Sequence, residues 1–329
     1  MRVLSEILNR QSHHLCLAPL RGVTDHVFRH CFARHFGGID WALAPFIETV
    51  AGLRVKSSLL REPAASRTEC PPVTPQILTK SVSEFAVMLD ALATLGVSRV
   101  NLNAGCPASP IVRKGRGAGL LEAPERLCKL LEAGCARFPS GFSLKVRLGL
   151  TRADTLENLM PRLHAYPLAA LIVHPRTAEQ GYRGTVDLEA FARIAAICRH
   201  RLIYNGDIVT PVHLETLIQR FPSIRHWMIG RGLLHDPFLA ERFRGMPLGD
   251  ESARLQRFVC DYENACHAHA ANETIALGRL KAMWALLAPA LSVETAGLAR
   301  IRRAQTWPAY LAARAPWAQD ALAAHDGGV

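Results

Sequence analysis

Short apolar runs alternate along the chain with segments in which apolar residues recur every three or four positions. Runs that end at glycine, proline or a charged residue are typical of buried strands, and the segments between them are typical of amphipathic helices. Eight runs at a spacing of roughly 25 to 30 residues predict an α/β fold, a (β/α)8 TIM barrel. They lie at residues 15–19, 40–46, 73–78, 99–103, 143–148, 170–174, 202–205 and 227–230.

The segment 83–95 shows the helical spacing clearly. Its apolar residues fall on one face, which we expect to pack against the sheet. They are Phe85, Met88, Leu89 and Leu92. Either Thr79 or Ser81 could cap the start of this helix, because a hydroxyl there can accept from a free backbone N–H.

The alternation stops after Pro237, and helical patterns follow at 254–271, 273–287 and 293–304. The apolar stripe of the second helix indicates a core rather than a functional surface. We therefore predict a barrel domain at 1–243 and a small all-helical domain at 244–329. The segment 243–249, which contains glycine and proline, would link them.

The formal net charge of +11 changes this picture, because it is unusual for an enzyme of small metabolites. It indicates a polyanionic partner such as nucleic acid. Acidic and basic side chains balance after about residue 245, so the excess lies in the first part of the chain. A basic contact surface must then be formed by particular positions rather than by one uniformly charged domain.

The sequence also indicates in which cellular compartment the protein works. No apolar run approaches the roughly 20 residues of a membrane span, and the amino-terminal residues lack the apolar region of a secretory signal. The nine cysteines show no CxxC spacing, which disfavours a disulfide framework or a zinc site. We expect a cytoplasmic protein with reduced thiols, no bound metal, no membrane association and no obligate protein partner, and thus a monomer.

Cys106 stands in a loop directly after a predicted strand. The run that begins at Val97 is broken by Gly105 and Pro107, so the thiol falls at the carboxyl end of the strand. Ligands bind at that end in parallel α/β folds. A free cysteine is also a common apolar core residue, so the position alone leaves both roles open.

Polar residues follow most of the other predicted strands, where burial without a partner would penalise them. A bound ligand explains their recurrence. The turns 205–207 and 230–232 follow the seventh and eighth strands, where barrels commonly bind a phosphate, although both could be ordinary tight turns. Lys145 would place a positive charge near a ring that gains electron density, while Gln76 and His174 could hydrogen-bond a heterocycle. A buried core histidine is the alternative for His174.

The chain resembles the tRNA-dihydrouridine synthases over most of its length. The motifs that carry this resemblance lie in the order of the family at 18–25, 101–107, 114–121, 145–147, 174–177, 205–207 and 229–232. The resemblance implies a flavin-binding barrel followed by a helical RNA-binding domain. It implies the reduction of uridines in tRNA with FMN, and with NADPH (or NADH) as the ultimate donor.

The resemblance also implies roles for single residues. Cys106 matches the general acid, which protonates C5 of the uracil while the reduced flavin delivers hydride to C6. A thiol suits this role, since it is mostly protonated at neutral pH yet able to donate. The residues that would hold FMN are Pro19, Leu20, Arg21, Gln76, Lys145, His174, Asn205, Gly206, Asp207, Gly230 and Arg231.

A second set would face the uracil or the rest of the tRNA. It comprises Glu48, Asn103, Arg176, Tyr182, Arg279, Lys281 and Arg302. The segments 179–183 and 279–281 resemble the bacterial subclass that modifies uridine 16. That subclass usually carries an arginine where Glu48 stands, so a repulsive charge would replace a phosphate contact, and the target uridine stays open.

Two other functions remain compatible with these residues. A flavin-dependent reductase or dehydrogenase of free pyrimidines would share the barrel, the flavin and even the active-site cysteine. A non-catalytic tRNA-binding protein would share the scaffold and the charge. The helical region and the net charge of +11 disfavour the first, and the intact Cys106, Lys145 and His174 disfavour the second.

Overall fold

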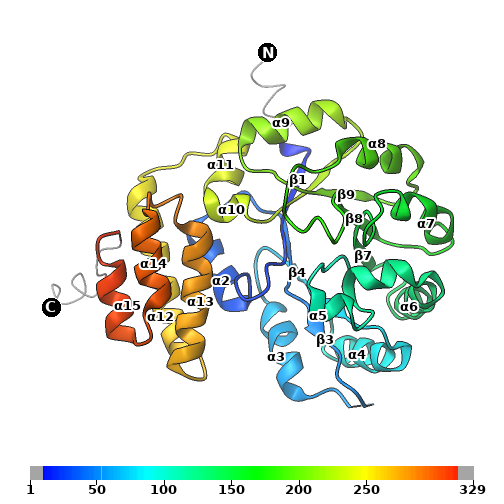
Figure 1. The fold of residues 1–329 in the computed structure, drawn as a ribbon, viewed down its shortest axis with the longest axis horizontal. Coiled ribbons are helices and arrows are strands. Elements are labelled where there is room, and N and C mark those ends of the chain that lie inside the picture. Colours follow the sequence, from blue (N-terminus) through cyan, green and yellow to red (C-terminus); the bar gives the residue numbers. More distant parts are fainter. Residues whose placement is uncertain (1–9, 53, 318–329) are drawn as a thin grey trace.

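The computed structural model describes residues 10–52 and 54–317, which form a barrel followed by a helical region (Figure 1). The predicted domains extend beyond this range, and residues 1–9 and 318–329 lie outside the described residues. The strands are β1 (His14–Leu17), β2 (Trp41–Leu43), β3 (Ile47–Glu48), β4 (Val73–Thr74), β5 (Gln76–Leu78), β6 (Val100–Ala104), β7 (Phe142–Arg147), β8 (Ala170–His174), β9 (Leu202–Asn205) and β10 (His226–Ile229).

These strands make eight passes of the sheet, because proline breaks two of them. Pro45 separates β2 from β3, and Pro75 separates β4 from β5. Proline has no backbone N–H to donate to the neighbouring strand, so the strand pairing breaks at these two points. β2 pairs with β1 and β4, while β3 pairs with β5, and all pairs are parallel. The pairing continues from β5 through β10 to β1, so the ring closes and confirms the predicted barrel.

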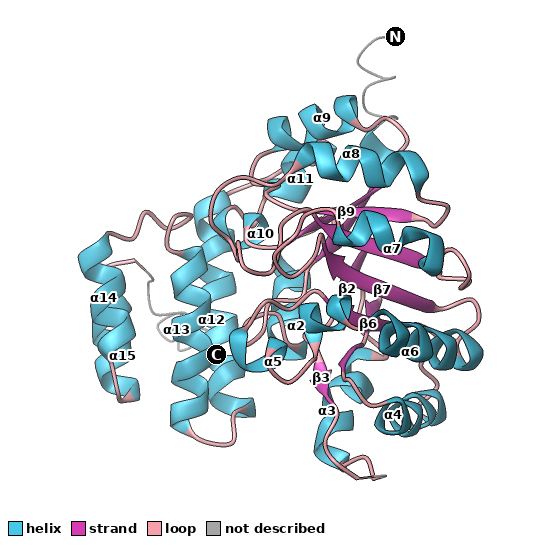
Figure 2. Cartoon of the chain, turned by 45° about the vertical axis from the view of Figure 1, so that its right-hand side comes forward, coloured by secondary structure: helices cyan, strands magenta, loops and turns pink. Residues whose placement is uncertain are grey.

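Helices that connect the strands cover the outside of the sheet (Figure 2). They are α2 (His26–His35), α3 (Ser57–Ser66), α4 (Val82–Thr94), α6 (Pro124–Arg137), α7 (Thr155–Leu163), α8 (Leu188–Ile197) and α9 (Pro211–Arg220). Ser81 caps α4 by accepting from the Glu84 N–H at 3.3 Å, and the four predicted apolar residues of this helix are buried. Two short segments, α5 (Ser109–Val112) and the 3-10 helix η1 (Gly117–Glu122), follow Cys106.

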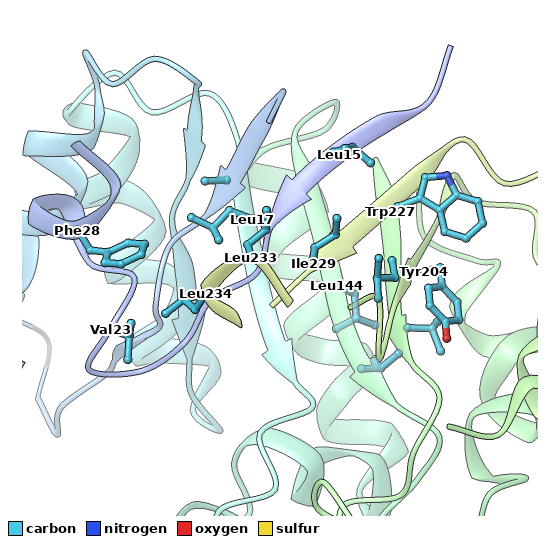
Figure 3. Close-up of a cluster of buried hydrophobic side chains, with 14 of the residues drawn as sticks. Leu15, Leu17, Val23, Phe28, Leu144, Tyr204, Trp227, Ile229, Leu233 and Leu234 are labelled. Atoms are coloured by element: carbon cyan, nitrogen blue, oxygen red, sulfur yellow. The ribbon is translucent and has the colours of Figure 1, made fainter. Parts of the chain in front are cut away.

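Alternation along each strand divides its side chains between two environments. Leu15 and Leu17 pack in the layer between sheet and helices, together with Trp227 and Ile229 of β10 (Figure 3). Cys16, between the two leucines, belongs to the apolar cluster inside the barrel. The interior cluster draws on strands β1, β2, β8, β9 and β10, at Cys16, Ala18, Leu43, Ala170, Ile172, Ile203 and Met228.

The same period places polar residues inside the barrel on β5, β6 and β7. Gln76 stands opposite Asn101, and Asn103 stands opposite Lys145, in the register of these strands. The barrel interior is therefore apolar on one side and polar on the other. Polar side chains that point into the barrel and are shielded from water need hydrogen-bond partners. The hydrogen bonds that they form determine the geometry of the site described below.

The helical region gathers on one side of the barrel, with α14 and α15 farthest from it (Figure 1). It comprises α12 (Glu251–His269), α13 (Glu273–Leu287), α14 (Thr295–Arg303) and α15 (Trp307–Arg314). The first three confirm the predicted helices, whereas α15 was not expected. Two further helices, α10 (Gly232–His235) and α11 (Leu239–Arg244), complete the barrel. Among the described residues, no helix combines the length and apolar character of a membrane span.

Aromatic residues join the helical region to the barrel. Phe258 of α12 contacts Phe28 and Phe32 of α2, and Phe36 directly after that helix, at ring distances of 5.8, 6.0 and 5.1 Å. One continuous core includes residues of both parts. The chain leaves helical conformation at Gly245, where φ is +66°, so Phe243 and Arg244 of the predicted linker lie in α11 instead. We propose the boundary between the two parts in residues 245–250.

Candidate functional site

A cavity of about 520 Å³ opens at the carboxyl ends of the barrel strands. Its lining includes all eleven residues that the resemblance assigns to FMN, together with Cys106, Asn103 and Tyr182. The position matches the face on which barrels of this kind bind their ligands. The remaining predicted residues are not part of the lining: Glu48, Arg176, Arg279, Lys281 and Arg302.

A chain of amide side chains crosses the polar side of the barrel. Gln76 Nε2 donates to Asn101 Oδ1 at 2.7 Å, and Asn103 Nδ2 donates to Gln76 Oε1 at 2.9 Å. Asn103 Oδ1 in turn accepts from the backbone N–H groups of Gly105 and Cys106, at 3.0 and 2.9 Å. The amide of Asn103 therefore fixes the turn that carries the thiol.

The residues after the thiol fold back on it. Cys106 O accepts from the Ala118 N–H at 3.1 Å. Gly117 between them has a φ of +57°, and a Cβ at this position would lie 2.7 Å from Cys106 O. Only glycine fits both the conformation and the space. The loop 106–118 is thus closed at its two ends, with Cys106 half-buried at the cavity.

The cavity concentrates positive charge. Burial, followed by repulsion from Arg147, lowers the pKa of Lys145 to about 7. Burial also lowers the pKa of Arg147 to about 10. Among the described residues, Lys145 has no carboxylate or other hydrogen-bond partner. A cation in this condition favours an anionic ligand, because such a ligand would relieve the repulsion.

His174 is held in its neutral form. Burial, and then the positive charges of Arg147, Lys145, Arg176 and Arg231, lower the pKa of His174 well below its usual range. An Nη1 of Arg176 lies 3.2 Å from His174 Nε2. Since arginine can only donate, Nε2 accepts and the proton of the neutral ring lies on Nδ1. His174 can therefore donate one hydrogen bond to a ligand through Nδ1.

Asp207 links the turns after β8 and β10. Its carboxylate forms a bidentate pair with Arg176, in which Nη1 lies 2.9 Å from Oδ1 and Nη2 contacts Oδ2. Arg231 Nη2 approaches Asp207 Oδ1 at 3.4 Å. Arg176 is 1% exposed and is not part of the cavity lining, so its predicted contact with the uracil stays a prediction. Asp207 and Arg231 line the cavity and have internal partners as well.

Tyr182 covers one side of the cavity entrance. Its side chain is 53% exposed, and its ring lies 4.4 Å from the guanidinium of Arg231 and 5.5 Å from that of Arg147. Arg147 Nη1 also donates to the carbonyl groups of Thr177 and Gly181, at 2.8 and 2.7 Å. Arg147 thereby anchors the loop that presents Tyr182.

Comparison with known proteins bears directly on this site. The family model described as dihydrouridine synthase (Dus) matches residues 16–306, which include nearly the whole barrel and most of the helical region.

The chain belongs to the dihydrouridine synthase family.

Individual members of the family are similar over most of their length. The tRNA-dihydrouridine(16) synthase of Cupriavidus necator is 32% identical over 269 residues, which cover 78% of this chain and 83% of that relative. The enzyme of the same description from Ralstonia nicotianae is 30% identical over 287 residues, with 82% of this chain and 87% of that relative covered.

Solved structures outside the family share the barrel. Morphinone reductase matches with a TM-score of 0.53 at 12% identity, covering 71% of this chain and 86% of that chain. The old yellow enzyme from Trypanosoma cruzi matches with a TM-score of 0.53 at 11% identity, covering 77% of this chain and 94% of that chain. These similarities concern the fold, which they confirm.

Three of the five predicted residues outside the cavity of this family member lie on the helical region, and Glu48 lies at the end of β3. Arg279 on α13 forms an ion pair with Asp25, at 3.0 Å between Nη2 and Oδ2, so it connects the helical region to the motif 18–25. Lys281 is half-buried on the same helix, and Arg302 is exposed on α14. Glu48 pairs with Arg116 of the loop after Cys106.

Several lining residues of the dihydrouridine synthase cavity were not singled out from the sequence, and Phe46, His235 and Leu286 are among them. Phe46 follows the break at Pro45, and the guanidinium of Arg21 lies 5.2 Å from its ring. His235 lies at the end of α10, and Leu286 comes from α13. A proline inside an apolar run could have drawn attention to Phe46. Leu286 belongs to a helix whose apolar residues predict only a core.

Proposed function

We propose that this chain is a flavin-dependent tRNA-dihydrouridine synthase that reduces the C5–C6 double bond of uridine 16 in the D-loop, with electrons from NADPH through FMN. The observation that carries the proposal is the position of Cys106 in a cationic cavity lined by the residues expected to hold FMN. Membership of the family supports the reaction. The descriptions of the similar relatives from Cupriavidus and Ralstonia support position 16.

The residues of the cavity suit FMN. The ammonium of Lys145 has no anionic partner among the described residues and could face the electron-rich edge of the ring, and Arg21 and Arg231 add charge for the phosphate. His174 Nδ1 and the backbone of the turn 205–207 would provide further hydrogen bonds. When bound, FMN would supply a hydride for C6 of the uracil.

Cys106 would complete the reduction. Its Sγ–H would donate a proton to C5 of the uracil, and the resulting thiolate would regain a proton from water. Asn103 and Gln76 orient the turn that carries the thiol. Addition of one hydride and one proton saturates the double bond and balances the reaction.

The uridine must leave the stacked tRNA to enter the cavity, which requires contacts with the RNA around it. Lys281 and Arg302 present positive charge on α13 and α14, and Tyr182 offers an exposed ring at the entrance. We assign these three residues to tRNA binding, with the backbone contacts dominated by the cations.

The pKa of Lys145 predicts how flavin affinity depends on pH. An anionic cofactor would raise this pKa above its value of about 7 in the free protein. Below pH 7 the lysine is already charged and adds no pH dependence of its own. Above pH 7 binding must take up a proton, so the FMN dissociation constant rises by up to ~tenfold per pH unit. Fluorescence titration of FMN from pH 6 to 9 measures this rise, and Lys145→Met should remove it. A slope that persists in Lys145→Met contradicts the assignment.

The proposed function is tested by position-resolved detection of dihydrouridine in tRNA. In cells that lack the gene, dihydrouridine at position 16 is expected to disappear, and the restored gene should return it. Restoration with Cys106→Ala is the matched control and should not return it. Loss at another position would retain the chemistry and exclude position 16, and no change at any position would exclude the function.

A further inference from the structure

Glu48 and Arg116 form an ion pair between the end of β3 and the loop that follows Cys106. The pair is not a loose surface contact, since the Arg116 side chain is 12% exposed and that of Glu48 is 34% exposed. Arg113 and Lys114, the neighbouring cations of the same loop, are both exposed. Only Arg116 among these three cations turns inward.

A second carboxylate stabilises the position of Arg116. Arg116 Nη2 lies 3.8 Å from Oε2 of Glu84, in the first turn of α4. Glu84 Oε2 also accepts from the hydroxyl of Thr49 at 2.8 Å, and that hydroxyl lies 2.8 Å from the Thr79 hydroxyl. Arg116 Nε is buried without a hydrogen-bond partner. The two carboxylates are therefore the groups that hold the guanidinium.

The backbone connects Arg116 directly to the residue that carries the thiol. Gly117, the next residue, packs on the Cys106 carbonyl, and Ala118 donates to that carbonyl at 3.1 Å. A displacement of Arg116 would move these two residues and would loosen the loop 106–118 around the thiol. A shift of about 1 Å at a reacting group can lower a rate by ~100-fold, so such a contact has functional weight.

We propose that Glu48, with Glu84, fixes Arg116 and thereby positions Cys106 for proton transfer. Glu48 is a positioning residue in this assignment. Its carboxylate pairs with Arg116 and does not face the phosphates of the tRNA. The effect on catalysis rests on the proposed function. The restraint that Glu48 and Arg116 place on the loop 106–118 rests on the contacts alone. It also explains how an acidic residue can stand at the rim of an RNA-binding cavity.

The test compares Glu48→Gln with the wild-type full-length protein, as purified. The first readout is the rate at which iodoacetamide alkylates Cys106, followed by peptide mass spectrometry. The second is the single-turnover rate of dihydrouridine formation at saturating tRNA. In Glu48→Gln we expect alkylation to be at least ~threefold faster and reduction to be ~tenfold slower. The dissociation constant for tRNA and its salt dependence should stay unchanged.

Further variants separate positioning from folding. Arg116→Met should repeat the effect of Glu48→Gln, and Arg116→Lys should lose less because it keeps the charge. Glu189→Gln removes a comparable carboxylate from an exposed pair with Arg220 and should change neither readout. Flavin content and NADPH oxidation verify that each variant is folded.

The outcomes distinguish this proposal from the proposed function. A changed salt dependence of tRNA binding with unchanged alkylation would make Glu48 an RNA contact and overturn the proposal. Alkylation and reduction at wild-type rates in Glu48→Gln would also overturn it. If the wild-type protein forms no dihydrouridine, the proposed function fails, and the alkylation rates still decide whether Glu48 restrains the loop.

Discussion

Cys106→Ala is expected to lower dihydrouridine formation by ~10²–10⁴-fold while flavin binding and NADPH oxidation stay intact. The substitution removes the Sγ–H that donates to C5 and leaves the cationic residues of the cavity in place. The turn is held through the backbone N–H of Cys106, which alanine retains. Mass spectrometry of the tRNA product and the absorbance of the bound flavin measure the two parts separately.

A matched control guards against a general effect of losing a thiol. Cys128 lies half-buried on α6, outside the cavity lining. Cys128→Ala should keep the rate of dihydrouridine formation, since alanine suits a helix interior. If Cys106→Ala lost its flavin, the role of Cys106 as a proton donor would be wrong and a role in the cofactor site would replace it.

Phe258→Ala is expected to lower the free energy of unfolding of the whole chain by about 3–5 kcal/mol. Phe258 is 1% exposed, and its ring contacts two phenylalanines of α2 and Phe36 directly after that helix. Its loss opens a cavity at the junction of the barrel and the helical region. Because the core is continuous across this junction, chemical denaturation followed by circular dichroism should show one transition at a lower midpoint.

The control for this variant is Ile275→Ala on α13. Ile275 is 44% exposed, so its truncation should change the unfolding free energy by less than ~0.5 kcal/mol. A Phe258→Ala protein that unfolds in two separate transitions, with the barrel at its wild-type midpoint, would show that the two parts are stable independently. The aromatic junction would then be a docking contact and not a shared core.

Local sequence pattern predicted the barrel because its signals lie within single elements. Apolar runs that end at glycine, proline or a charged residue identify strands, and the alternation of side chains along those strands places Gln76, Asn103 and Lys145 inside the barrel. The breaks at Pro45 and Pro75 were missed, since an apolar run interrupted by one proline still resembles one strand. The effect of each proline depends on which neighbouring strand pairs with the residues before it and which pairs with the residues after it.

The candidate site was predicted as a set of positions but not as a set of contacts. Arg176 follows β8 as a ligand-binding residue would, yet its charge is used by Asp207, which lies 31 residues later in the sequence. Glu48 likewise meets Arg116 across 68 residues. Such pairs depend on the closed barrel, so no local pattern around either partner reveals them. The family motifs indicated where polar side chains gather, and the fold determined which of them remain available to a ligand.

Leu286 gives the cavity a wall from outside the barrel. An exchange of helical regions between two members of the family would therefore transfer part of the cavity wall along with the proposed RNA-binding surface. Hybrids designed to alter the choice of uridine would carry an altered pocket unless Leu286 and the neighbouring turn of α13 were retained. A change of the helical region made to alter substrate choice would thus also change the cavity in which the reaction takes place.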